Sequence, residues 1–357
     1  MKKFYVVLLL LSCTSILIFN QCKLSNGKVN FDVTAKPFEK LSEYHFFKGA
    51  LSDLIPNDRV LPYEVITALF TDYAHKARFV WMPEGKSAKY VKDEVLDFPT
   101  GTVLIKNFFY ENNENDASKG KRIIETRLLV KRADKWDAID YVWNDKQTDA
   151  ELNIVGDTKD VNFINKQLQK VHVNYFVPNQ NQCKNCHNLD NVFMPIGPKV
   201  RYLNKDFKYA DGVKNQLEKW SEVGYLTGYN KEENIHNKIA DAFDPNSGTV
   251  EERAKSYLEV NCSHCHRREG SANNSGLFLQ FKEKNPESWG IMKSPVAAGA
   301  ASGNNLYDIV PGKPDESILV YRISENDPEI RMPELGRTIQ HKEAVELIRE
   351  WIKEMKQ

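Results

Sequence analysis

The chain has no excess of charge of either sign, since its 357 residues contain 49 Lys and Arg and 49 Asp and Glu. Proteins that bind nucleic acid or an anionic membrane surface through general electrostatics usually carry a clear basic excess. The balance therefore argues against both classes, and nucleic acid is not an expected partner. A hydrophobic fraction of 41% is ordinary for a soluble protein, and this length allows two or three domains.

Long apolar runs are scarce. The main one follows the basic start Met1–Lys3 and extends over residues 4–19, with a polar break at 12–15. This is shorter than the roughly 20 residues of a membrane span, and it predicts a secretory signal peptide over residues 1–22. Cys13 and Cys22 both stand near places where a lipoprotein signal can end, so a lipid anchor is left open as the one expected link to a membrane. We expect a location in the periplasm or cell envelope.

Cysteine is also scarce, with six residues in the whole chain. Apart from Cys13 and Cys22, all of them lie in two copies of the pattern C-x-x-C-H, which are Cys183-Lys184-Asn185-Cys186-His187 and Cys262-Ser263-His264-Cys265-His266. This pattern is the attachment signature of a c-type haem. Two thiols add to the two vinyl groups on one porphyrin edge, and the histidine that follows gives its Nε2 to iron. The sequence therefore predicts two haem c groups, with His187 and His266 as iron ligands.

Two other classes of site also use paired cysteines. A zinc ribbon separates its pairs by roughly 15–20 residues, whereas Cys186 and Cys262 are several times farther apart. A thioredoxin-like redox pair needs a βαβ context, which the sequence does not indicate. The histidine after each pair also has no purpose in either class, so we favour haem.

The pattern of the remaining chain predicts an α+β protein, with a β-rich N-terminal domain followed by two mainly α, cytochrome c-like haem domains. β-branched and aromatic runs at 102–105, 126–130 and 141–143 predict strands. Apolar spacing over 161–173 predicts a helix before the first motif. The expected domains are 23–155 for the β-rich part, 156–248 for the first haem domain and 249–357 for the second.

The second motif comes with more of its expected surroundings than the first. Thr249-Val250-Glu251-Glu252 is a capping box that opens a helix leading to Cys262. An amphipathic helix is expected over 341–355. Met332, just before that helix, is the expected second iron ligand of this haem, where a thioether raises the potential.

The first motif has no equivalent methionine in the same place. The candidates for its second iron ligand are Met82, which we place first, Met194, a histidine such as His172 or His236, or an open position. The Gly197-Pro198 pair resembles the small class I cytochromes c, in which a proline carbonyl accepts the Nδ1–H of the iron-bound histidine. We carry that role to Pro198.

The mature chain resembles a family of uncharacterised bacterial diheme c-type cytochromes. The likeness rests on the two motifs and on seven stretches: Leu61–Tyr63, Leu69–Ala74, Phe98–Thr102, Glu125–Leu129, Asn181–His187, Pro195–Lys199 and Glu252–Cys262. The resemblance implies an exported diheme protein with no established reaction. Such proteins are sometimes encoded beside a parallel β-helix protein, which is thereby a candidate partner.

Three functions follow from these expectations. The favoured one is electron transfer between extracytoplasmic redox partners through two covalently bound haems. The alternative is a peroxidase-like diheme oxidoreductase, in which an open or weakly ligated first haem does chemistry. In the third, the β-rich domain is a binding module and the haems act as a relay. Whether the protein is an enzyme is therefore left open, with electron transfer preferred.

Overall fold

The structure is a computed structural model that describes residues 27–296 and 298–356. The expected signal peptide, with Cys13 and Cys22, lies outside the described residues. Within them, no helix is both long and apolar enough to cross a membrane.

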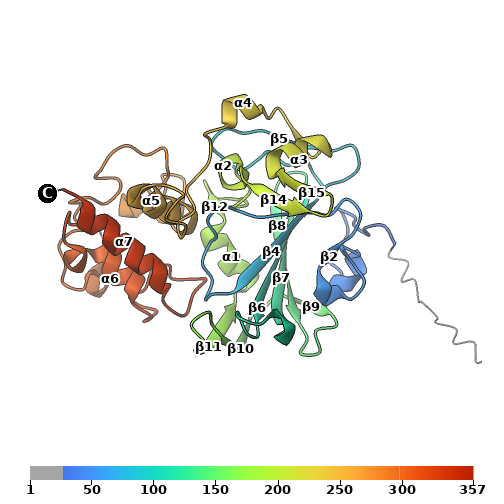
Figure 1. Ribbon diagram of the computed structural model, residues 1–357, viewed down its shortest axis with the longest axis horizontal. Helices are drawn as coiled ribbons and strands as arrows, with labels where there is room; N and C mark the ends of the chain where they lie inside the picture. Colours follow the sequence, from blue (N-terminus) through green and yellow to red (C-terminus); the bar gives the residue numbers. More distant parts are fainter. Residues whose placement is uncertain (1–26, 297, 357) are drawn as a thin grey trace, which may run out of the picture.

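A six-stranded antiparallel sheet forms the centre of the molecule (Figure 1). Its spatial order is β3-β4-β6-β7-β8-β9, formed by β3 (Leu61–Tyr63), β4 (His75–Trp81), β6 (Val103–Glu111), β7 (Lys121–Lys131), β8 (Trp136–Trp143) and β9 (Ala150–Asn153). The predicted strands at 102–105, 126–130 and 141–143 are confirmed as parts of β6, β7 and β8. These runs form strands because β-branched and aromatic side chains pack well on a pleated surface.

The two faces of this sheet differ because side chains alternate along each strand. Val103, Ile105, Leu128, Val130 and Tyr141 point to one face. There they pack against the segment that precedes β3, which contains β1 (Phe47–Lys48) and β2 (Ile55–Pro56). The opposite face carries Leu104, Lys106, Arg127 and Leu129 among other residues, and it forms one wall of a cavity.

The predicted helix over 161–173 is wrong. This segment belongs to a hairpin of β10 (Asp157–Ile164) and β11 (Lys170–Val177). Its apolar residues alternate with period two, and Val161, Phe163, Val173, Tyr175 and Val177 all enter one core cluster with Phe108 of the central sheet. The turn at 165–169, in which Leu168 is exposed, separates two strands that the helical spacing joined into one element.

The expectation of two mainly α haem domains is also wrong. Helices make up 22% and strands 26% of the structure. Residues 156–248 contain β10–β11 and two further hairpins, β12 (Asn188–Leu189) with β13 (Val192–Phe193) and β14 (Asp206–Tyr209) with β15 (Gly212–Asn215). Their helices are short: α1 (Gln180–Cys186), α2 (Val200–Leu203), α3 (Gln216–Glu222) and α4 (Lys231–Asn234).

Residues 156–248 pack closely onto the central sheet. Val200, Leu203 and Trp220 share a core cluster with Val80 and Met82 of the N-terminal part. In addition, β16 (Leu226–Thr227) pairs in parallel with β5 (Ala88–Lys89). The domain limits at residues 155 and 248 stay predictions, and the packing is continuous across the first of them.

The C-terminal segment gathers its helices on one side of the sheet (Figure 1). Residues Ala254 and Leu258 of α5 (Val250–Asn261) pack with Leu347, Ile348 and Trp351 of α7 (Lys342–Glu354). α6 (Ile318–Ser324) joins the same cluster. Both expected helices, 249–261 and 341–355, are confirmed within one residue at their starts. Between α5 and α6, however, the chain forms turns and single turns of 3-10 helix, so this segment is not mainly helical either.

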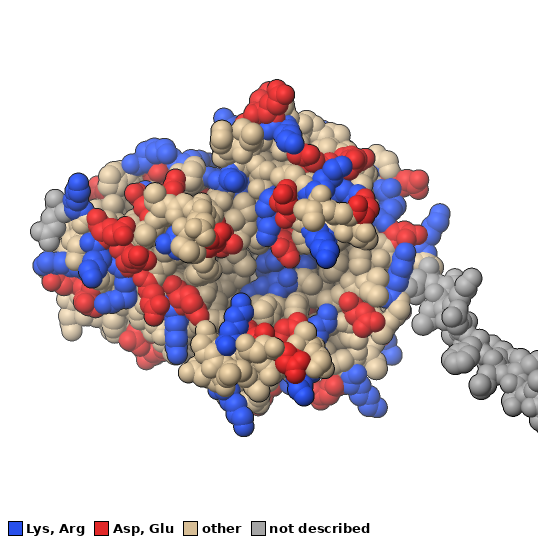
Figure 2. All heavy atoms as spheres, viewed as in Figure 1, with Lys and Arg blue, Asp and Glu red and all other residues tan. Residues whose placement is uncertain are grey.

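Two lobes are visible in Figure 1 and Figure 2: one contains the central sheet with residues 156–248, and the other is the C-terminal segment with α5, α6 and α7. Basic and acidic side chains are interspersed over both lobes, as the zero net charge suggests (Figure 2). Basic side chains also lie in a hollow near the centre of this face.

Candidate functional site

The first C-x-x-C-H motif lies on helix α1. Asn179 caps this helix through a capping box: its side chain accepts from the Gln182 amide (3.0 Å), and the Gln182 side chain accepts from the Asn179 amide (2.9 Å). Residues three apart on a helix lie on the same face, so one short helix presents Cys183 and Cys186 together. His187 follows directly as the C-cap.

The ring of His187 is held in one tautomer. Its Nδ1 lies 2.8 Å from the carbonyl oxygen of Met194, and a carbonyl can only accept, so Nδ1 carries the hydrogen. Nε2 therefore keeps a free lone pair, as a metal ligand requires. Burial lowers the pKa of His187 to about 3, which keeps the ring neutral. The expected acceptor, Pro198, is wrong, because its carbonyl instead accepts from the amide of Leu96 (3.0 Å).

His266 of the second motif is arranged in the same way. Its Nδ1 lies 3.1 Å from the hydroxyl oxygen of Ser275. That hydroxyl donates its own hydrogen to the carbonyl of Ala272 (2.7 Å), so towards His266 it accepts. Nε2 of His266 is again left with its lone pair, and burial lowers the pKa of this histidine to about 4.

The two motifs, distant in sequence, are in contact. The ligand atoms of Cys186, His264 and Cys265 all lie within 4.8 Å of one another. Ser271 donates to the carbonyl of Asn185 (2.8 Å), whose oxygen is 3.6 Å from the Cys265 sulfur. A hydrogen bond between the two thiols raises the pKa of Cys186 and lowers that of Cys265.

This cluster also bears on the zinc hypothesis. It takes one cysteine from each pair together with His264, whose Nδ1 is buried and has no hydrogen-bond partner among the described residues. Cys183 and Cys262 are not part of it. A four-cysteine zinc site is therefore not what the fold assembles, although three donors of this kind can hold a metal ion.

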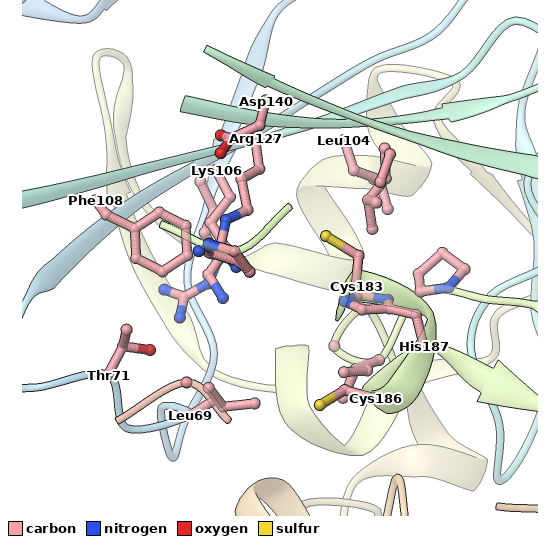
Figure 3. A pocket seen from close by; sticks show the side chains of 18 of the residues that line it. Leu69, Thr71, Leu104, Lys106, Phe108, Arg127, Asp140, Cys183, Cys186 and His187 are labelled. Atoms are coloured by element: carbon pink, nitrogen blue, oxygen red, sulfur yellow. The ribbon is translucent and has the colours of Figure 1, made fainter. Parts of the chain in front are cut away.

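A cavity of about 500 Å³ opens beside the first motif. Cys183, Cys186 and His187 line one side, and the charged face of the sheet lines the other (Figure 3). The loop at 65–71 and the segment Pro333–Gly336 of the C-terminal part complete the walls. Figure 3 shows Lys106, Arg127 and Phe108 across the cavity from Cys183.

The charged residues of the sheet wall were missed by sequence reasoning. Arg78, Lys106, Arg127 and Asp140 all line the cavity, yet in the sequence they read as the solvent-facing positions of amphipathic strands. These residues could have been found from the sequence, because in each strand they alternate with apolar residues. Such alternation places them on one common face of the sheet.

The methionines expected as second ligands lie in different surroundings. Met332 is half-buried; its amide donates to the carbonyl of Arg322 (3.0 Å), and its carbonyl accepts from Arg337 (2.9 Å). The next residues, Pro333, Leu335 and Gly336, line the cavity of the first motif. Met82 is fully buried in the core cluster that contains Val80 and Trp220. It is not among the residues lining the cavity, which does not favour it as an iron ligand.

Met194, His172 and His236, which the sequence also suggests as ligands of the first haem, do not line the cavity either. The carbonyl of Met194 binds the Nδ1 side of the His187 ring, so this residue adjoins the wrong nitrogen. The side chain of His172, on β11, is 60% exposed, and His236 is exposed. Among the described residues that line the cavity, the histidines are His187 and His264, and none is a methionine.

The residues at the first motif fit a c-type haem in three respects. Two thiols line a cavity within the usual size of a cofactor pocket, the histidine beside them is neutral with Nε2 available, and basic side chains stand opposite. At the second motif, Cys262 packs against the α5–α7 cluster and His266 offers the same nitrogen.

Comparisons of the chain with protein-family models, with curated proteins and with solved structures found no match. The likeness to diheme cytochromes therefore rests on the motifs and stretches given above and stays a prediction.

Proposed function

We propose that this protein is an exported diheme c-type cytochrome that transfers electrons between extracytoplasmic redox partners. Cys183 and Cys186 would hold one haem with His187 as iron ligand, and Cys262 and Cys265 the other with His266. The bound groups supply one-electron iron chemistry. Partners would be exported redox proteins, with a β-helix protein as a further candidate.

The two C-x-x-C-H motifs carry this proposal, and the contact between them supports electron transfer from one haem to the other. Cys186 and Cys265 belong to different motifs, yet their sulfur atoms lie within 4.8 Å of each other. Each cysteine would be bonded to the edge of its own porphyrin. The attachment edges of the two groups would therefore meet, which gives electrons a short route from one to the other.

The protein residues around each motif support the ligand roles. His187 and His266 both donate Nδ1–H to a fixed oxygen, which orients the ring and makes Nε2 a better electron donor. Both are neutral because they are buried. Met332 remains the proposed second ligand at the second motif, and a thioether there would raise the potential.

The first experiment measures covalent haem. Haem stain should survive denaturing electrophoresis, and the variants Cys183→Ala/Cys186→Ala and Cys262→Ala/Cys265→Ala should each retain half of the haem. The four-alanine variant should retain none. Zinc in the purified protein without haem stain would contradict the proposal and assign Cys186, His264 and Cys265 to a metal ion instead.

A second experiment tests Met332. Met332→Ala should lower the potential of one haem and leave the other unchanged. Met292 is an exposed loop methionine, so Met292→Ala is the matched control. Equal potentials in wild type and Met332→Ala would remove this residue from the ligand set.

The peroxidase-like function is favoured by one observation, the absence of methionine among the described residues that line the first cavity. An open iron position there would give a high-spin spectrum and rapid reaction of the reduced protein with peroxide. Two low-spin haems that react with neither peroxide nor carbon monoxide would exclude it.

A further inference from the structure

A row of charged residues crosses the sheet wall of the first cavity. Arg78 of β4 is the direct cross-strand partner of Lys106 of β6. Lys106 is the partner of Arg127 of β7, and Arg127 is the partner of Asp140 of β8. All four line the cavity, and Figure 3 shows Lys106, Arg127 and Asp140 grouped opposite Cys183 and His187.

Three adjacent cations are a costly arrangement in the absence of a counter-ion, because like charges directly opposite each other destabilise a sheet. Arg127 has an acidic partner, since Glu125 accepts from its Nε (2.8 Å) and Nη2 (2.5 Å). In the described part of the chain, neither Arg78 nor Lys106 forms an ion pair. Burial, together with the charges of Arg78 and Lys76, lowers the pKa of Lys106 well below its ordinary value.

Asp140 forms no ion pair with this row in the described part of the chain. Both of its carboxyl oxygens are buried without a hydrogen-bond partner among the described residues. Burial and then the neighbouring Glu125 carboxylate raise its pKa well above the ordinary value, which disfavours its charged form. Glu125 is itself fully buried and accepts a hydrogen bond from Tyr175. It therefore pairs with Arg127, and Arg78 and Lys106 are left without an acidic partner among the described residues.

We propose that the row Arg78, Lys106 and Arg127 is a carboxylate-binding site that holds the two propionate groups of the haem attached at Cys183 and Cys186. The inference rests on the proposed function and names the residues that orient this haem. The thioether bonds would fix the vinyl edge of the porphyrin at α1. The opposite edge, which carries the propionates, would then face the row, because the row lies across the cavity from Cys183 (Figure 3).

Charge and geometry both suit this occupant. The two propionates would supply acidic partners for Arg78 and Lys106, which have none among the described residues. Arg78 can bind one carboxylate through two parallel hydrogen bonds, whereas Lys106 acts as a point charge. Such pairs offset the cost of leaving water only when each charge is matched and hydrogen-bonded.

The test uses the full haem-loaded protein. Arg78→Gln and Lys106→Met should each lower the potential of the first haem, because loss of a nearby positive charge favours the oxidised state. We expect a change of at least tenfold in the reduction equilibrium, which is 59 mV for one electron. Arg122→Gln is the matched control, since Arg122 lies on β7 but pairs with exposed Asp145. Arg78→Lys retains the charge and should retain the potential.

A second measurement needs no variant. In wild-type protein, infrared difference spectra should show both propionates of the first haem ionised even below about pH 4, where an ordinary carboxyl group titrates, because the row lowers their pKa. Propionates that protonate in the ordinary range would overturn the inference, as would unchanged potentials in folded, haem-stained Arg78→Gln and Lys106→Met proteins.

The remaining outcomes separate this inference from free-anion binding and from failure of the proposed function. Haem-loaded protein is titrated with succinate and with inorganic phosphate. Binding that Arg78→Gln abolishes would show that the row takes a free anion, and it would overturn the propionate assignment. Absence of covalent haem in wild type would contradict the proposed function itself, whereas stained protein with unaltered potentials would contradict only the role of the row.

Discussion

At the scale of single residues, hydrogen-bond partners decide what the two motif histidines can do. His187 and His266 both give Nδ1–H to an oxygen, yet one partner is a backbone carbonyl and the other a serine hydroxyl. The sequence was sufficient to identify the histidines. It was not sufficient to identify Met194 and Ser275 as their hydrogen-bond partners, because the position of each partner depends on how the loop after the motif folds back. The analogy with class I cytochromes c pointed instead to the carbonyl of Pro198, which accepts from the amide of Leu96.

His341, outside both motifs, should make stability depend on pH. Its ring stacks on Phe70 (4.0 Å between centroids) and its Nδ1 contacts the Tyr257 hydroxyl (3.2 Å). Burial lowers its pKa to about 4. In the unfolded chain this histidine takes up a proton near pH 6.5, whereas in the folded chain it does so only near pH 4. The free energy of unfolding should therefore fall by about 3 kcal/mol as the pH is lowered from above 6.5 to 4.

Urea unfolding from pH 7 to 4 measures this loss. His341→Gln should have a flatter pH dependence over that range, and the exposed His172, changed to Gln, should leave it as in wild type. Equal slopes in wild type and His341→Gln would show that other groups dominate.

A second prediction concerns the buried ion pair between Arg201 of α2 and Glu259 of α5, which are 3.2 Å apart and almost fully buried. Removal of one partner leaves an uncompensated buried charge, so Arg201→Met or Glu259→Leu alone should cost about 3–5 kcal/mol of unfolding free energy. The double variant should recover most of it. The exposed pair Lys214–Glu222 is the control, and its removal should leave the free energy of unfolding close to that of the wild type.

At the scale of elements, the sequence correctly predicted the helices and strands that short-range interactions determine. The capping box at Thr249 and the apolar stripe of 341–355 gave α5 and α7, and β-branched runs gave β6, β7 and β8. The hairpin β10–β11 was missed because Phe163, Ile164, Leu168 and Val171 also fit a helical stripe. Packing against Phe108 and Tyr110 of the central sheet decides between the two, and that contact is not local.

The capping box gives an element-scale prediction. Thr249 accepts from the Glu252 amide (3.2 Å), and the Glu252 carboxylate accepts from the Thr249 amide (2.8 Å). Thr249→Ala should lower the free energy of unfolding by about 1 kcal/mol, as measured by urea titration. Thr249→Ser retains the oxygen and should remain near wild type; an equal loss in both variants would mean that the methyl group, not the cap, is responsible.

At the scale of the whole molecule, segments far apart in sequence build the site. The cavity takes its walls from the central sheet, from α1, from the loop at 65–71 and from Pro333–Gly336. Each motif could be recognised from the sequence by itself. The contact of Cys186 with Cys265 depends on how the two lobes dock, and the shared face of Arg78, Lys106 and Arg127 depends on strand register. Neither can be predicted from the local pattern of charges.

One link between the N-terminal part and the C-terminal segment can be tested. The Asp72 carboxylate accepts from the amides of Thr338 (2.6 Å) and Ile339 (2.9 Å) and from the Thr338 hydroxyl (2.9 Å). Asp72→Asn should tolerate the same positive φ of 46° but lose the charged acceptor, at a cost of about 3 kcal/mol. Hydrogen exchange at Thr338 and Ile339 should accelerate, whereas exposed Asp145, changed to Asn, should have no effect.

The contact between the two motifs also constrains the order in which the protein matures. In the folded chain, Cys186 and Cys265 face each other across the junction of the lobes, and Cys262 packs against the C-terminal core. An assembly enzyme needs these same thiols free, reduced and accessible. Under the proposed function, haem attachment must therefore precede docking of the lobes. In a chain whose lobes docked first, Cys186 and Cys265 would be close enough to be oxidised to a disulfide, and neither thiol could then bind haem.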